Sequence, residues 1–282
     1  MTSWKIVTDS SCDYRSIQHL TDSIAFESVP FNITIGNQVF VDDGSIETAD
    51  IINVLLEEDG SSSTACPSPD LFAKAFEQSD HILCFTISSN ISGSFNSANI
   101  AKDLILEKYP HKNIYILDSR SASTEMNLLI TKAIDLIHQG LDFQTVIGEL
   151  ESYHQTTSVN FLLFSVNNLV KNGRVPKIIG QMIGLLGINL IGRRTPEGTI
   201  ELAHKTKGKQ RSYRALQKEM VEQGFTGGHL DITHVNNEEH AHKFISYLEK
   251  SFDNLTYDIH LATNLNGYYA EKDGIIVSYH TR

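Results

Sequence analysis

Cysteine is scarce in this sequence, and no hydrophobic run is long. The 282 residues include three cysteines, Cys12, Cys66 and Cys84. An odd number of scattered cysteines predicts neither a disulfide framework nor a metal-ligand spacing. The longest apolar stretch, Ile178–Gly192, is shorter than the roughly 20 residues that a membrane-spanning helix needs, and the first residues lack the apolar core of a secretory signal. We therefore expect a cytoplasmic protein.

Positive charge is also in short supply. Lysine and arginine total 23 against 34 aspartates and glutamates, a formal net charge of −11. Nucleic-acid binding depends on neutralising phosphates, so this balance argues against it. The chain has no P-loop, no dinucleotide-binding glycine fingerprint, no GxSxG elbow and no HExxH motif. We expect no nucleic-acid partner, no cofactor and no metal.

The order of the predicted elements favours an α/β fold in two domains, as the length also suggests. In the first half, short apolar strands such as His81–Ile87 and Asn113–Asp118 alternate with amphipathic helices. This alternation is typical of a mostly parallel sheet. From about Ser158 the strands are short and partly alternate apolar with polar residues, which is typical of an α+β domain. We predict an N-terminal α/β domain over 1–157 and a C-terminal α+β domain over 158–282.

A serine-rich segment joins a predicted strand to a predicted helix. Ile87–Ala98 contains five serines and Gly93, and it has no charged residue. Serines cap helices, because the side-chain oxygen accepts a hydrogen bond from the first turn. A helix start also carries free N–H groups and partial positive charge, which makes it suitable for an anion. Both interpretations, helix capping and an anion site, remain open from the residues alone.

Five segments, taken in order, resemble the DegV family of bacterial lipid-binding proteins. They are KIVTDSSCDY (5–14), TACPSPDLF (64–72), ISSNISGSFNSA (87–98), LDSRSAS (117–123) and NGRVPKIIGQMIGLLGINLIG (172–192). The resemblance implies a two-domain DegV-like fold with a long-chain fatty acid between the domains. It also implies similarity to the binding subunits of fatty acid kinase, which present the bound carboxylate to a separate kinase that uses ATP.

The resemblance further implies which residues bind the lipid. The family's carboxylate-binding threonine corresponds to Thr64 and its carboxylate-binding serine to Ser92. Ser89, Gly93 and Ser94 complete the lipid-binding loop in this interpretation. No catalytic residue is implied.

Two basic residues correspond to positions that serve the kinase partner and phosphoryl transfer, namely Arg174 and Lys207. The sequence departs from the family at several other positions, among them Lys272–Asp273 in place of Gly–Pro and Asn189–Leu190 in place of Lys–Pro. Ala270 stands where a histidine is frequent, and Ala65 and Cys66 stand where serine and glutamine are usual.

We interpret the protein as a non-catalytic intracellular carrier of a long-chain fatty acid, with a fatty acid kinase subunit as candidate partner and transient contact with membranes. Burial of the alkyl chain favours binding by roughly 0.8 kcal/mol for each methylene, and a buried carboxylate needs hydrogen bonds. The composition of Ile178–Gly192 suits a pocket wall and plain core packing equally.

One alternative function is an acyl-ester hydrolase with Ser92 or Cys66 as nucleophile, although neither has an evident general base nearby in sequence. The other is a lipid-sensing regulator.

Overall fold

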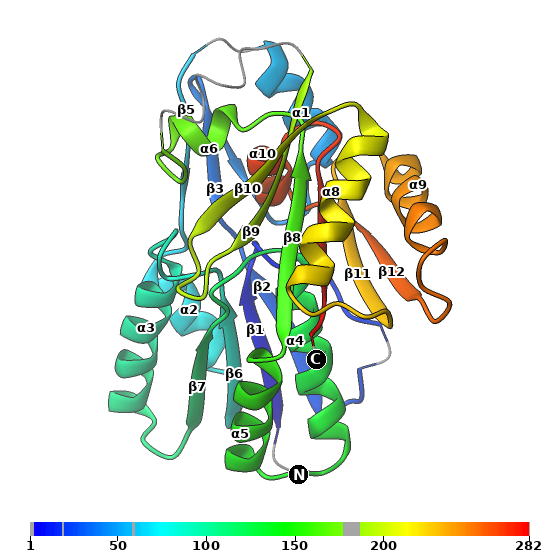
Figure 1. The fold of residues 1–282 in the computed structure, drawn as a ribbon. Coiled ribbons are helices and arrows are strands. Elements are labelled where there is room, and N and C mark those ends of the chain that lie inside the picture. Colours follow the sequence, from blue (N-terminus) through cyan, green and yellow to red (C-terminus); the bar gives the residue numbers. More distant parts are fainter. Residues whose placement is uncertain (1–2, 19, 58–59, 177–186, 282) are drawn as a thin grey trace.

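The computed structural model describes residues 3–18, 20–57, 60–176 and 187–281, which form three β-sheets. The first sheet has the strand order β2-β1-β6-β7, and all neighbouring strands are parallel. Its strands are β1 (Trp4–Asp9), β2 (Ile24–Val29), β6 (His81–Thr86) and β7 (Asn113–Asp118). Parallel strands need crossover connections, and helices cover both faces (Figure 1). These helices are α2 (Pro69–Phe76), α3 (Ser94–Lys108), α4 (Thr124–His138) and α5 (Phe143–His154).

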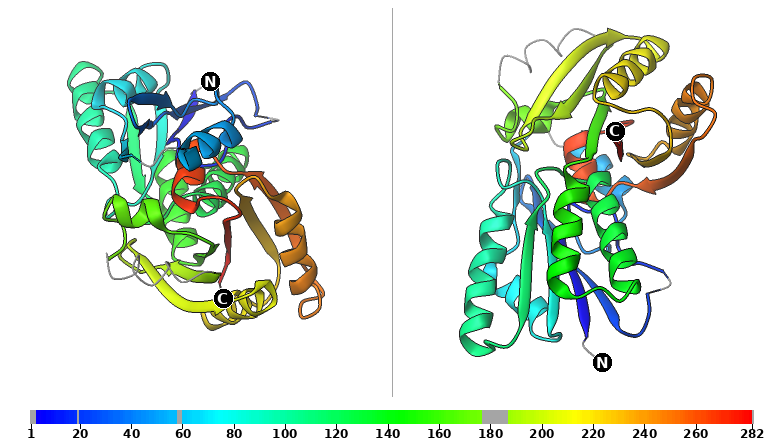
Figure 2. Two further views of the ribbon diagram at one scale, coloured as in Figure 1. Left: turned by 90° about the horizontal axis from the view of Figure 1, so that it is seen from above. Right: turned by 60° about the horizontal axis from the view of Figure 1, so that its bottom comes forward.

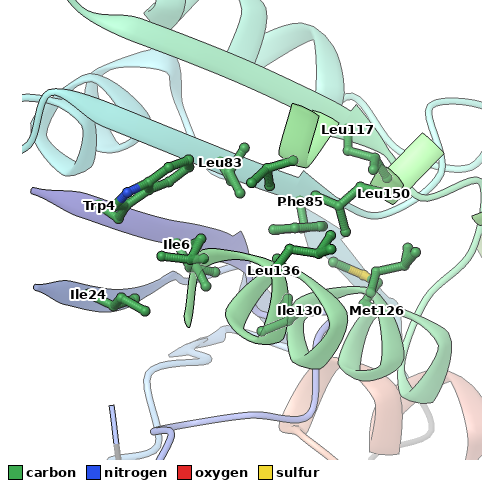
Figure 3. Close-up of a cluster of buried hydrophobic side chains, with 14 of the residues drawn as sticks. Trp4, Ile6, Ile24, Leu83, Phe85, Leu117, Met126, Ile130, Leu136 and Leu150 are labelled. Carbon is green, nitrogen blue, oxygen red and sulfur yellow. The ribbon is translucent and has the colours of Figure 1, made fainter. Parts of the chain in front are cut away.

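Both faces of this first sheet are hydrophobic. Trp4, Ile6 and Phe85 point to one face, where they meet Met126 of α4 and Leu150 of α5 (Figure 3). Successive side chains of a strand point to opposite faces, so the intervening residues pack against α2 and α3. This explains why the strands have continuous apolar runs. The sheet is fixed between two helical layers, and the loops at its strand ends are free to form a site.

The second sheet is six-stranded and mainly antiparallel, in the order β10-β9-β8-β13-β11-β12. Only the β11–β12 pair is parallel. Its strands are β8 (Thr157–Leu163), β9 (Ile188–Arg194), β10 (Ile200–Lys207), β11 (His229–His234), β12 (Thr256–Leu261) and β13 (Ile275–His280). Helices α8 (Lys209–Glu222) and α9 (Glu238–Leu248) cover its outer face (Figure 2). The inner face is turned towards the first half of the chain.

A small antiparallel sheet connects the two halves. It consists of β3 (Asn32–Ile35), β4 (Gln38–Val41) and β5 (Ser62–Ala65), and three helices lie near it, α1 (Thr48–Glu57), α6 (Asn167–Lys171) and α10 (Asn264–Ala270). Tyr268 of α10 is fully buried in one cluster with Ile33, Ile35 and Ile51. Helix α10 therefore packs into the first half of the chain although it belongs to the second by sequence.

The predicted fold class is confirmed, because a parallel α/β sheet is followed by an α+β unit. Along the chain, the first strand of the six-stranded sheet is β8, which starts at Thr157. The division into 1–157 and 158–282 stays a prediction, since α10 is embedded in the other half. Of the predicted pocket wall, 178–186 lies outside the described residues. No helix in the described part of the chain is long and apolar enough to cross a membrane.

Candidate functional site

A cavity of about 370 Å³ lies between the loops of the first sheet and the inner face of the second. Val159, Phe161 and Leu163 of β8 line it, because alternate residues of a strand share one face. Ile276 of β13, the cross-strand partner of Phe161, extends this apolar wall. The opposite wall comes from loops at the carboxyl ends of β6 and β7, the edge at which parallel α/β sheets usually bind ligands.

The lining is mainly apolar, and its polar members are of few kinds. Helix α10 contributes four lining residues, Leu265, Asn266, Tyr269 and Ala270. Helix α6 contributes Leu169, and strand β10 contributes Ile200. Among the described residues that line the cavity, none is aspartate, glutamate, histidine or lysine. The charged lining residues are three arginines, Arg120, Arg174 and Arg194. The cavity thus combines an apolar wall with positive charge.

The conformation of the serine-rich loop depends on Asp9. This carboxylate is fully buried at the end of β1 and accepts hydrogen bonds from Ser11 N at 3.1 Å, Ile87 N at 3.0 Å and Ser94 Oγ at 2.5 Å. Burial raises the pKa of Asp9, while these hydrogen bonds act in the opposite direction. Ser94 is therefore used to attach the start of α3 to β1, and it lies outside the lining.

Two further serines of the loop also make structural hydrogen bonds. Ser88 Oγ donates to the carbonyl of Gly198 at 2.7 Å, which ties the loop to the β9–β10 hairpin. Ser89 is exposed, and its hydroxyl donates to Asp118 at 2.5 Å. Ser89, like Ser94, lies outside the lining, so for both residues a role in lipid binding stays a prediction. Anchoring therefore explains Ser88, Ser89 and Ser94, whereas the N-cap of α3 is Gly93 and no side-chain capping hydrogen bond forms there.

Ser92 differs from these serines, because it lines the cavity and is half-buried. Its oxygen accepts a hydrogen bond from Ser94 N at 3.2 Å. Within the described residues its hydroxyl proton has no acceptor, so the group can donate to a ligand. Gly93 also lines the cavity, and a Cβ at this position would lie 3.3 Å from Cys66 Sγ. Cys66 therefore packs where the serine loop meets the segment that follows β5.

Thr64 lines the same cavity from β5. Its hydroxyl lies 2.7 Å from the hydroxyl of Tyr269 on α10. Burial raises the pKa of Tyr269. The hydrogen bond to Thr64 and the charge of Arg174 lower it by less, so the phenol keeps its proton at neutral pH. Two hydroxyls side by side share one hydrogen bond and leave a second proton to donate. Tyr269 was not predicted, because nothing in the sequence near it indicates that α10 reaches this cavity.

The predicted basic residues are in different surroundings. Arg174 is half-buried at the cavity and donates to the carbonyl of Asn172 at 2.9 Å. Within the described residues it has no carboxylate partner, whereas Arg194 is neutralised by two 2.7 Å hydrogen bonds to Glu125. Lys207 is exposed at the end of β10 and does not line the cavity. Arg174 and the exposed Arg120 are thus the two lining arginines without a carboxylate partner among the described residues, and Arg174 is the more buried of the two.

The fold and the cavity define an α/β protein with a largely apolar ligand site between its two larger sheets. A family model described as "Uncharacterised protein, DegV family" matches residues 3–281, and the chain belongs to this family. A DegV domain-containing protein of Streptococcus gordonii is 38% identical over 276 residues, which are 98% of each chain. The resemblance stated from the sequence is confirmed.

Two solved structures with high similarity contain fatty acids. The Fak B3 (fatty acid kinase) protein of Streptococcus pneumoniae, loaded with linoleic acid, is 38% identical, with a TM-score of 0.96 over 99% of this chain and 100% of that one. A DegV family protein of Eubacterium eligens, loaded with heptadecanoic acid, is 32% identical, with a TM-score of 0.95 over the same shares. The fold is therefore that of proteins known to bind fatty acids.

Proposed function

We propose that this protein binds a long-chain fatty acid, with the alkyl chain against β8 and the carboxylate between Thr64 and Ser92. The observation that carries the proposal is the lining of the cavity. It is mainly apolar, it contains hydroxyl donors and arginines, and it contains no carboxylate among the described residues. Its 370 Å³ lies within the roughly 300–1,000 Å³ typical of small-molecule sites. The fatty acids in the two similar structures support the same ligand class.

The energetics fit an amphipathic ligand. The alkyl chain contributes roughly 0.8 kcal/mol for each methylene that it removes from water. The carboxylate is costly to bury unless donors replace its water. Ser92, the Thr64–Tyr269 pair and the unpaired charge of Arg174 supply donors and positive charge for this purpose.

We prefer a non-catalytic carrier to a hydrolase. A serine or cysteine nucleophile needs an adjacent general base, and no described lining residue beside Ser92 or Cys66 is a histidine or carboxylate. We further propose that the carrier is intracellular and presents its lipid to a separate fatty acid kinase, as the name of the Fak B3 relative suggests. A lipid-sensing regulator would share the same pocket but would need no kinase.

The carboxylate assignment is tested by titrating the purified, delipidated protein with a fluorescent fatty acid. Thr64→Val and Ser92→Ala each remove one donor to a charged group, so each is expected to weaken binding by about tenfold to a hundredfold. Ser89→Ala is the comparison on the same loop: Ser89 lies outside the lining, so about the wild-type affinity is expected, whereas a loss would support the lipid-binding role that the resemblance implies. Equal affinity for all four proteins would refute the assignment. An equal loss in Ser89→Ala would extend the site to the whole loop.

The kinase proposal is tested with a bacterial fatty acid kinase catalytic subunit and ATP. Cations near the acceptor carboxylate stabilise the charge that develops in phosphoryl transfer. Arg174→Ala and Lys207→Ala are therefore expected to lower acyl-phosphate formation by about tenfold, and to lower fatty-acid affinity by less. Equal losses in both assays would assign these residues to the pocket alone. If the wild type gave no acyl-phosphate, the kinase proposal would be refuted, and the carrier proposal would stand without it.

A further inference from the structure

A second cavity, of about 430 Å³, lies between α8 and α9. These helices cover the outer face of the six-stranded sheet, whereas the fatty-acid cavity lies on its inner face. One wall comes from the first turns of α8. The other comes from residues spaced three or four apart, which occupy one face of α9 and its end: Glu239, His242, Lys243, Ser246, Tyr247 and Lys250. The cavity is therefore separate from the site described above.

Its charge is opposite to that of the whole chain. Three lysines, Lys209, Lys243 and Lys250, face one glutamate, Glu239, in a protein whose formal net charge is −11. Lys243 forms a 2.6 Å ion pair with Glu239. Lys209 and Lys250 have no ion pair within the described residues. The wall thus carries an excess of two positive charges at neutral pH.

The start of α8 adds to this positive charge. Lys209 and Arg211 lie in its first turn, and no acidic residue does. The helix dipole favours anions at this end and disfavours cations. Basic residues at this position therefore reduce the stability of the free protein, and a bound anion would reverse that effect.

Tyr213 provides an independent observation. It lines the cavity, is 2% exposed, and its buried hydroxyl has no hydrogen-bond partner within the described residues. A buried donor without a partner is unfavourable. Burial raises the pKa of Tyr213 to about 12, with Glu239 adding to the effect, so the hydroxyl keeps its proton at neutral pH. The hydroxyl oxygen has less than 1 Å² of solvent-accessible surface, so a ligand acceptor in the cavity satisfies it only after neighbouring side chains move.

We propose that the cavity between α8 and α9 binds a phosphate-bearing anion, with the Tyr213 hydroxyl as donor and Lys209, Lys243 and Lys250 as counter-charges. Lysine suits phosphate, because its ammonium is a compact charge with three donors. The same chemistry belongs to a soluble phosphorylated compound and to a phospholipid headgroup. The proposal is independent of the fatty-acid proposal, because it concerns other residues on the other face of the sheet.

Three variants distinguish a ligand site from incidental surface charge. Lys250→Ala is expected to weaken binding by about fivefold, as for a partly exposed ion pair, and Tyr213→Phe by about tenfold. Tyr213→Phe should not lower the melting temperature of the ligand-free protein, since the hydroxyl is unpartnered there. Glu239→Gln removes the competing carboxylate from Lys243, so it should tighten binding by about twofold to fivefold. Lys218→Ala, an exposed lysine of α8 outside the cavity, is the control.

The experiment uses the full chain loaded with fatty acid, at constant ionic strength. One arm titrates pyrophosphate by calorimetry, and the other measures sedimentation with vesicles of equal parts phosphatidylglycerol and phosphatidylcholine. Binding in the first arm that follows the predicted variant order identifies a soluble phosphate ligand. The same order in the vesicle arm alone identifies a headgroup. Binding in neither arm, or binding unaffected by these variants, would overturn the proposal, and fatty-acid titration of the same samples reports separately on the other site.

Discussion

The Asp9 carboxylate connects the end of β1 to the loop after β6 and to the start of α3. Two of its hydrogen-bond donors, Ser11 N and Ile87 N, are backbone groups that cannot reverse their role. Ser94 Oγ is a hydroxyl, which can donate or accept. An anion with two acceptor oxygens satisfies all of them, although burial raises its pKa. The serine loop is thus positioned by a residue that does not line the cavity.

We predict that Asp9→Asn lowers the free energy of unfolding by about 1–3 kcal/mol, even though it removes a buried charge. An amide has only one acceptor oxygen, so its NH₂ group would face either Ser11 N or Ile87 N. Denaturant unfolding measures the loss, and Asp70→Asn, an exposed residue of α2, is the control. A variant as stable as the wild type would mean that desolvation of the charge outweighs the lost acceptor.

At the scale of the secondary-structure element, Gly192 determines where Phe161 lies. The two residues are cross-strand partners in β9 and β8. A Cβ at Gly192 would lie 2.2 Å from the Phe161 ring and 2.6 Å from the carbonyl oxygen of Glu201. The ring therefore covers the glycine and forms part of the cavity wall.

Gly192→Ala is expected to cost about 1–3 kcal/mol of stability, as overpacking does, and to weaken fatty-acid binding by moving Phe161. Gly148→Ala is the matched control, because this glycine is exposed in α5 and a Cβ there meets nothing within 4 Å. The control should gain about 0.5–1 kcal/mol. Thermal unfolding and lipid titration of both variants measure these effects. If Gly192→Ala left stability and affinity unchanged, β8 and β9 would be shown to separate easily enough to admit the methyl group.

The same strands and helices show what the sequence can predict. Apolar runs and helix periodicity are local, so the parallel sheet and the α+β unit follow from the pattern. The serine loop is also local, and it was predicted to lie between strand and helix. Its division into anchoring Ser94 and cavity-lining Ser92 depends on the buried Asp9, which lies some 80 residues away in sequence. Tyr269 could not be predicted either, because α10 contacts β5 only through long-range packing.

At the scale of the whole molecule, the two halves are joined by buried polar contacts as well as by the shared core. Asp13, which follows β1, accepts hydrogen bonds from Thr233 Oγ1 at 2.7 Å, Thr263 N at 3.1 Å and Asn266 Nδ2 at 2.8 Å. All three donors come from the second half of the chain. The geometry of the cavity therefore depends on both halves being folded and in contact.

Asp42 makes the corresponding contact at the start of α10. Its fully buried carboxylate accepts hydrogen bonds from Asn264 N at 3.0 Å and Leu265 N at 3.1 Å. It also pairs with Arg15 at 2.5 Å. One carboxylate from the first half thus fixes the helix that supplies Tyr269 and three other residues of the cavity wall.

We predict that Asp42→Ala lowers stability by about 3 kcal/mol, because it leaves a cation and two backbone donors without their acceptor. Since α10 is held through this group, its amides should exchange faster with solvent, and fatty-acid affinity should fall by about tenfold or more. Asp43→Ala is the control, because the adjacent carboxylate is exposed and binds only Ser45 within the described residues. Hydrogen exchange and lipid titration measure both effects. If α10 kept its protection while affinity fell, Asp42 would act on the ligand by charge rather than by positioning the helix.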